Sequence, residues 1–135
     1  MGDRAMAEIK TEGGSLYVYT HWGGHDLPDA AKEAVLSARD RWGDYTYATR
    51  IIVDQLIKPS RDLETGHGLT LSPDAEDEYN NDNPSVVIDL IKEKLTIIRD
   101  GEAKSTPFRE IEWKRRITSR EYMEARRNCI IQMRK

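Results

Sequence analysis

The spacing of the apolar residues changes twice along this chain, and this change restricts the folds that it can adopt. Over residues 15–22 (SLYVYTHW), aromatic and β-branched side chains alternate in the pattern of a strand. Between residues 26 and 59, the apolar positions recur every three or four residues, as they do along one face of a helix. From residue 85 to residue 99, short β-branched runs return. Strands that are followed by helices and then by further strands predict an α+β domain.

Two helices are predicted after the first strand, and their ends are marked by single residues. Asp26 is placed to cap the first helix, and Pro28 falls in its first turn, where a missing N–H costs no hydrogen bond. Gly43 ends this helix, Asp44 is placed to cap the second, and Pro59 ends the second. Because the connection between them is so short, we expect the helices to form a packed pair.

A hairpin and a short strand are predicted after the helices. Residues 85–91 (SVVIDLI) and 95–99 (LTIIR) are β-branched runs separated by a short charged turn. The Asp100-Gly101 pair marks a second tight turn, and residues 69–71 suit a short strand. Together with residues 15–22, these segments predict an antiparallel sheet of about four strands, with the helical pair placed after the first strand.

The two ends of the chain have different patterns. Residues 1–14 carry a Gly-Gly pair and no apolar periodicity, which predicts a flexible N-terminal arm. Near the other end, Thr118 and Glu121 have the spacing of a capping box, which predicts a C-terminal helix. We expect residues 15–135 to form a single α+β domain, because a chain of 135 residues suits one core.

Charge is distributed unevenly in this chain, whose net charge is -3. Residues 102–135 hold ten basic and five acidic residues, hence +5, which leaves -8 for residues 1–101. Residues 62–82 hold seven acidic residues and no Lys or Arg. This division favours a homodimer or a partner protein of opposite charge. A nucleic-acid partner is not expected, because proteins that bind nucleic acid are normally basic overall.

Several functional classes lack the residues that they require. No apolar run approaches the roughly 18 residues of a membrane helix, and the first residues lack the apolar core of a signal peptide. The single cysteine, Cys129, excludes a disulfide framework, and the three histidines have no metal-ligand spacing. Glycine-rich nucleotide motifs and nucleophile elbows do not occur. We expect a cytoplasmic protein without metal or cofactor, and a binding protein more than an enzyme.

Three groups of residues are candidates for ligand binding. The first lies at the end of the first strand, where imidazoles and glycine N–H groups suit an anionic ligand. The second places arginines beside aromatic residues, which suits stacking on a base and pairing with phosphate. The third is a glycine-flanked loop with an acid, a hydroxyl and an imidazole. In this order the groups are His21, Trp22, Gly23 and Gly24; Arg41 and Arg50; and Glu64, Thr65 and His67.

Distinctive short stretches occur between residues 15 and 90: LYVYTHWGG at 16–24, DLP at 26–28, RWGD at 41–44, RII at 50–52, ETGHG at 64–68, DNP at 82–84 and VVID at 86–89. Together they resemble a family of small bacteriophage and prophage proteins of unknown function. The resemblance implies a phage accessory protein in the cytoplasm of a bacterial host. Small phage proteins of this kind often resemble counter-defence factors, which bind a host protein or sequester a nucleotide signal.

Three interpretations of the function are open from the sequence. The first is a non-enzymatic phage accessory protein that sequesters a nucleotide-like ligand or binds a bacterial host protein. The second is a small hydrolase or nucleotide-modifying enzyme that uses His21 or His67 as its base. The third is a protein-interaction module that acts through the acidic stretch or through the basic C-terminal helix.

Overall fold

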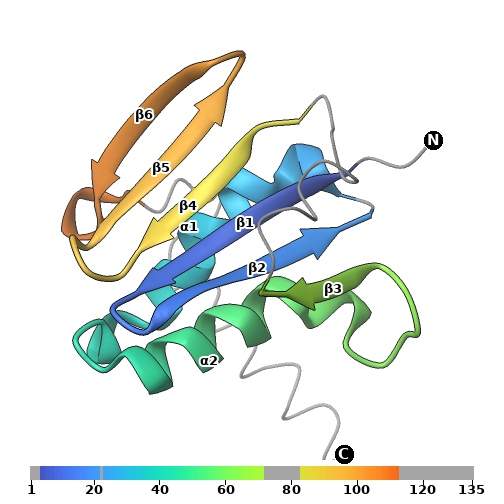
Figure 1. Cartoon of the computed structure of the whole chain (residues 1–135), viewed down its shortest axis with the longest axis horizontal. Helices are drawn as coiled ribbons and strands as arrows, with labels where there is room; N and C mark the ends of the chain where they lie inside the picture. Colours follow the sequence, from blue (N-terminus) through green and yellow to red (C-terminus); the bar gives the residue numbers. More distant parts are fainter. Residues whose placement is uncertain (1–3, 22, 72–82, 113–135) are drawn as a thin grey trace, which may run out of the picture.

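A six-stranded mixed sheet and two helices form the fold in the computed structural model, which describes residues 4–21, 23–71 and 83–112 (Figure 1). The strands lie in the order β3-β2-β1-β4-β5-β6. β1 and β4 are parallel, and all other neighbouring pairs are antiparallel. The elements are β1 (Ala5–Thr11), β2 (Gly14–Thr20), α1 (Leu27–Ser37), α2 (Tyr45–Ile57), β3 (His67–Thr70), β4 (Ser85–Asp89), β5 (Lys94–Arg99) and β6 (Glu102–Pro107), with short 3-10 helices η1 (Gly24–Asp26), η2 (Arg39–Arg41), η3 (Lys58–Ser60) and η5 (Phe108–Glu110).

The core lies between one face of the sheet and the helices. Along β1, the side chains of Ala5, Ala7 and Ile9 alternate into this core and are fully buried. The register places Ala7 beside Val18 of β2 and beside Val86 of β4, so the apolar rows continue across the strands. α1 lies against β1 and β4, behind them in Figure 1, and packs along α2.

Small side chains on α1 allow the helix to approach the sheet closely. Ala31, Ala34 and Ala38 recur at helical spacing and are fully buried, facing a sheet whose central strand also presents alanines. The aromatic ring of Trp42 lies beside that of Phe108 at 5.0 Å between centroids and closes one end of the core. The predicted stripe of α1 is therefore confirmed as the face that packs on the sheet.

The predicted starts of both helices and the end of α2 are confirmed, whereas α1 ends at Ser37 and not at Gly43, because the 3-10 turn η2 follows it. Asp26 occupies the N-cap position of α1 without a capping hydrogen bond from its side chain, and Pro28 lies in the first turn. Asp44 caps α2, where its side chain accepts a hydrogen bond from the Tyr47 backbone N–H at 3.4 Å. α2 ends at Ile57, directly before the 3-10 turn that contains Pro59.

The sheet differs from the predicted four antiparallel strands in three respects. β1 lies inside residues 1–14, for which a flexible arm was predicted, and it is an interior strand of the sheet. β6 is a further strand with no apolar alternation, and it forms by pairing with β5 across the Asp100-Gly101 turn. β4 joins β1 in parallel, so the sheet is mixed. Alanine is a weak strand former, and long-range parallel pairing leaves no local pattern, which explains these errors.

Two turns fix the strands at the other edge of the sheet. Asp100 and Gly101 have φ values of 52° and 81°, which suit the two-residue type I′ turn expected of an Asp-Gly pair. At the β4–β5 turn, the buried Asp89 side chain accepts hydrogen bonds from the backbone N–H groups of Ile91 and Lys92, both at 2.9 Å. This carboxylate ends β4 two residues before the predicted end of the strand.

Some predicted features lie outside the described residues. They include Trp22, most of the acidic stretch and the C-terminal helix with its capping box. Across the residues that the structure does describe, none of the helices has both the length and the apolar character needed to cross a lipid bilayer.

We predict that Asp89→Ala destabilises the fold through the β4–β5 turn. The substitution removes the carboxylate that accepts from two backbone N–H groups, and a hydrogen bond to a charged group contributes about 1.5–3 kcal/mol. Asp89→Asn keeps an acceptor oxygen of the same shape and is expected to cost clearly less. Urea unfolding of the three proteins checks this, and equal free energies of unfolding for the two variants would contradict it.

Candidate functional site

A cavity of about 400 Å³ lies at the end of β2 and β3. Its size falls within the range of small-molecule sites, which is roughly 300–1,000 Å³. It lies where β2 leaves the sheet and where the chain from α2 enters β3. The lining residues are Tyr19, His21, Thr65, Gly66, His67 and Gly68.

Backbone pairing between β2 and β3 sets the positions of the lining residues. Tyr19 lies directly opposite Gly68 in the antiparallel ladder. Beyond the end of β2, the His21 N–H donates a hydrogen bond to the Gly66 carbonyl at 2.8 Å. The pairing therefore extends past the strand and holds the His21 backbone against the turn that leads into β3.

Gly66 is required by the shape of this turn. Its φ is 109°, in a region that residues with a side chain rarely adopt. It is buried, and it turns the chain from the exposed Thr65 into β3. The glycine thus connects Thr65 to His67, the first residue of β3, and all three residues line the cavity.

Two hydroxyl groups hold the two imidazoles. The Tyr19 hydroxyl lies 2.7 Å from His21 Nδ1, and the Ser60 hydroxyl lies 2.6 Å from His67 Nδ1. Tyr19 and His21 project from the same face of the sheet. His67 is paired with Thr20, whose buried side chain faces the helices, so His67 projects from the opposite face. The imidazoles therefore reach one cavity from opposite faces of the β2–β3 ladder.

Burial keeps the His67 imidazole neutral. Desolvation lowers the pKa of His67 below the ordinary value of about 6.5, so the ring carries no charge at neutral pH. The Ser60 hydroxyl is also 3.5 Å from the Ile57 carbonyl, at the limit of a hydrogen bond, so the 2.6 Å contact with His67 is the stronger one. When Ser60 donates to Nδ1, the ring proton lies on Nε2, which then acts as a donor.

The lining of the cavity contains aromatic and imidazole rings, a hydroxyl and glycine backbone, and none of the lining residues is Lys, Arg, Asp or Glu. Within the described ranges, no three His, Cys, Asp or Glu side chains come together closely enough to hold a metal ion. The accessible lining is mostly apolar, so the arrangement suits a flat, uncharged ring that packs against it.

The structure brings three of the predicted ligand-binding residues together. His21, Thr65 and His67 line the same cavity, although 46 positions separate the two histidines in the sequence. Glu64 is exposed and adjoins Thr65 without lining the cavity. The predicted glycine turn forms at Gly23, which has a φ of 85°, and Gly24 is buried at the start of η1.

The two predicted arginines lie elsewhere on the molecule. Arg41 lies in η2, before α2, with its guanidinium carbon 5.2 Å from the centre of the Tyr47 ring. The cavity is near the other end of α2, whose 13 residues span about 20 Å. Arg50 is exposed on α2, and the nearby Asp54 forms its ion pair with Arg61 at 2.6 Å. Neither arginine lines the cavity.

Sequence reasoning missed two side chains of the site and the role of two glycines. Tyr19 was detectable, because the strand pattern places it on the same side as His21. Gly66 and Gly68 belong to the quoted loop, but their individual roles depend on the turn and on the strand register. Ser60 gave no signal, because only the packing of η3 against β3 brings it to His67.

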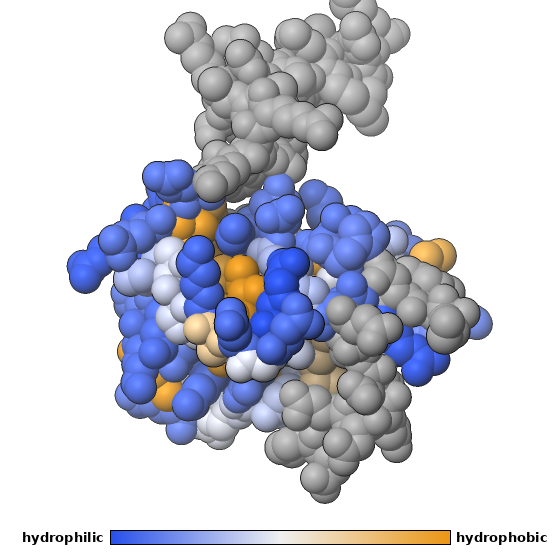
Figure 2. Space-filling view, turned by 90° about the horizontal axis from the view of Figure 1, so that it is seen from above, coloured by the Kyte–Doolittle hydropathy of each residue, from blue (hydrophilic) through white to orange (hydrophobic). Residues whose placement is uncertain are grey.

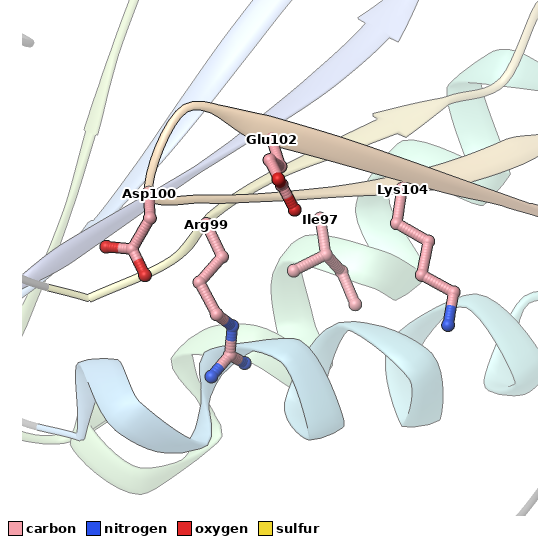
Figure 3. Close-up of a pocket in the computed structure, with 5 residues that line it drawn as sticks. All are labelled: Ile97, Arg99, Asp100, Glu102 and Lys104. Atoms are coloured by element: carbon pink, nitrogen blue, oxygen red, sulfur yellow. The ribbon is translucent and has the colours of Figure 1, made fainter.

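A second hollow, of about 460 Å³, is lined by residues of the β5–β6 hairpin. Arg99 and Lys104 extend from the hairpin towards α1, with Ile97 between them (Figure 3). Asp100 and Glu102 complete its lining, so that charges of both signs balance in this hollow. Figure 2, which views the molecule from above, shows a largely hydrophilic surface around a small apolar area. The balanced charges favour no single class of ligand, and the β2–β3 cavity is the stronger candidate.

Comparisons of the chain with protein-family models, with curated proteins and with solved structures gave no match. The functional argument therefore depends on the geometry and chemistry of the cavity.

We predict that His67 makes the fold sensitive to mild acid. Because its pKa is lower in the folded chain than in the unfolded chain, the unfolded chain binds more protons in acid. The contribution of His67 to the free energy of unfolding is complete above about pH 6.5, which is its pKa in the unfolded chain. This contribution is lost as the pH falls through the lower pKa of the folded chain. His67→Asn keeps a polar group near Ser60 but does not titrate. In urea unfolding at pH 7.5 and 5.5, the original chain should lose more stability than this variant.

The same variant supplies the control, since all other titrating groups remain in both proteins. Equal losses of stability between pH 7.5 and pH 5.5 would show that protonation of His67 does not oppose folding.

Proposed function

We propose that this chain is a non-enzymatic binding protein that holds the ring portion of a small nucleotide-like ligand in the β2–β3 cavity. The observation that carries the proposal is the meeting of the Tyr19 ring, two imidazoles and glycine backbone around about 400 Å³ of space. Nucleobase rings stack on aromatic side chains whatever the identity of the base, and each stacked base contributes about 1–3 kcal/mol. The neutral His67 imidazole and the Thr65 hydroxyl add groups that can form hydrogen bonds with such a ring.

The proposed biological role is that of a phage accessory protein in a bacterial host, where sequestering a nucleotide-like ligand serves counter-defence. This setting extends the sequence resemblance of residues 15–90 alone and does not follow from the cavity. A site that binds without turnover suits sequestration, because the ligand is withdrawn and not converted. Binding of a host protein through the acidic stretch or the basic C-terminal segment is the alternative, and most of those residues lie outside the described ranges.

One observation favours a second candidate, a small hydrolase. Ser60 and His67 lie 2.6 Å apart, which is the distance expected between a nucleophile and its base. However, only 9% of Ser60 is exposed, and Ser60 does not line the cavity. A nucleophile must reach the substrate, so this geometry favours Ser60 as the group that orients His67. We therefore place binding before catalysis.

Native mass spectrometry of the protein purified from its producing cells tests the proposal directly. We expect a bound mass of nucleoside or nucleotide size that is released on denaturation. If the purified protein is empty, it is titrated calorimetrically with adenosine, guanosine, cytidine and uridine. Absence of binding in both experiments would refute a nucleotide-like ligand. Conversion of a bound compound with time, lost in Ser60→Ala, would establish the hydrolase instead.

We predict that His21→Ala weakens binding of the nucleoside that the original chain prefers. Loss of a ring contact worth about 1–3 kcal/mol corresponds to roughly 5- to 150-fold in the dissociation constant. Arg50→Ala is the matched control, because Arg50 is exposed on α2 and away from the cavity lining. Calorimetry should find the control unchanged, with thermal melting showing that both variants fold. If both substitutions weaken binding equally, the ligand does not bind in this cavity.

A further inference from the structure

Gly68 occupies a position in β3 where the fold does not require glycine. Its φ lies outside the left-handed region, in contrast to that of Gly66. A Cβ atom built on Gly68 would have Tyr19 Cδ1 as its nearest contact, at 3.9 Å, which is an ordinary van der Waals separation. Glycine within a strand also weakens the strand through its extra backbone freedom. Neither backbone conformation nor packing therefore explains this residue.

The absent side chain leaves space beside the Tyr19 ring. Tyr19 and Gly68 are direct partners across the β2–β3 ladder, where the side chains of opposite residues contact one another. Any larger residue at position 68 would extend along the edge of the Tyr19 ring, inside the cavity that both residues line. The space that glycine leaves open is thus the space beside the Tyr19 ring, where a flat ring would lie.

The lining also restricts the charge of the bound group. It contains no Lys or Arg, and the nearest predicted phosphate ligands, Arg41 and Arg50, lie elsewhere. His67 is held neutral by burial. Removing a phosphate from water without a cationic partner is strongly unfavourable. Only an uncharged part of a ligand is therefore expected to enter.

We infer that Gly68 determines the specificity of this cavity, by leaving room for an uncharged heteroaromatic ring against Tyr19, so that the recognised chemistry is a base or nucleoside and not a phosphate. This inference rests on the proposed function and names the ligand class of the same site. Gly68 would act only through its small size, which leaves room for the ligand ring beside Tyr19.

The experiment compares Gly68→Ala and Gly68→Val with the original chain in calorimetric titrations with the four ribonucleosides and their 5′-monophosphates. Affinity for the preferred nucleoside should fall in the order Gly, Ala, Val, by at least tenfold for valine. The thermal midpoint should stay the same or rise, because both residues restrict the strand backbone more than glycine. The monophosphate should bind no more tightly than its nucleoside.

Gly43→Ala is the matched control. Gly43 lies in the turn before α2, its φ is ordinary, and a Cβ there would meet nothing within 4 Å. It should bind the nucleoside as the original chain does. Full-affinity binding by Gly68→Val, or a fall in its thermal midpoint, would overturn the role of Gly68 while the proposed function stands. A monophosphate bound tenfold more tightly than its nucleoside would overturn the uncharged ligand class. An original chain that binds no nucleoside would overturn the proposed function and this inference together.

Discussion

Alanine packing between β1 and α1 sets the distance between the sheet and the helices, and the rest of the structure depends on that distance. Ala5 and Ala7 of the strand face the core, as do Ala31 and Ala34 of the helix and Ala38 at its C-cap, and all five are fully buried. Larger side chains at these positions would force the layers apart, since closely packed cores do not absorb extra volume. β4 shares this interface, because α1 lies across both parallel strands.

The same layer spacing reaches the candidate site through α2. This helix packs along α1 and passes into η3, which carries Ser60. Ser60 in turn contacts His67 of β3 at 2.6 Å. The orientation of one cavity-lining imidazole is therefore connected to the helix–sheet packing, whereas the other is held within β2 by Tyr19. The two imidazoles of the cavity are thus held by different hydroxyl groups, one from β2 and one from η3.

Local signals in the sequence predicted the helices and the β4–β5 hairpin, because capping residues, proline and apolar spacing act over a few positions. The same reasoning failed for β1, whose alanines gain strand character only from burial under α1. It also failed for the pairing of β1 with β4, which depends on the whole chain. At the site, His21, Thr65 and His67 were predicted as ligands from their glycine-flanked context. Their meeting, and the exclusion of Arg41 and Arg50, required the register of β2 with β3 and the length of α2.

The parallel pairing of β1 with β4 has a consequence for the order in which the molecule forms. The Asn83 side chain donates a hydrogen bond to the Arg4 carbonyl, and these residues are 79 positions apart. β1 leaves the ribosome before the other described elements, and its second neighbour in the sheet is made only after both helices and β3. Contacts of such separation slow folding, because the intervening chain must be ordered before they form. During synthesis, one hydrogen-bonding edge of β1 therefore stays unpaired, and its apolar face stays incompletely covered, until β4 has been made. The nascent chain thus passes through a stage with an open strand edge.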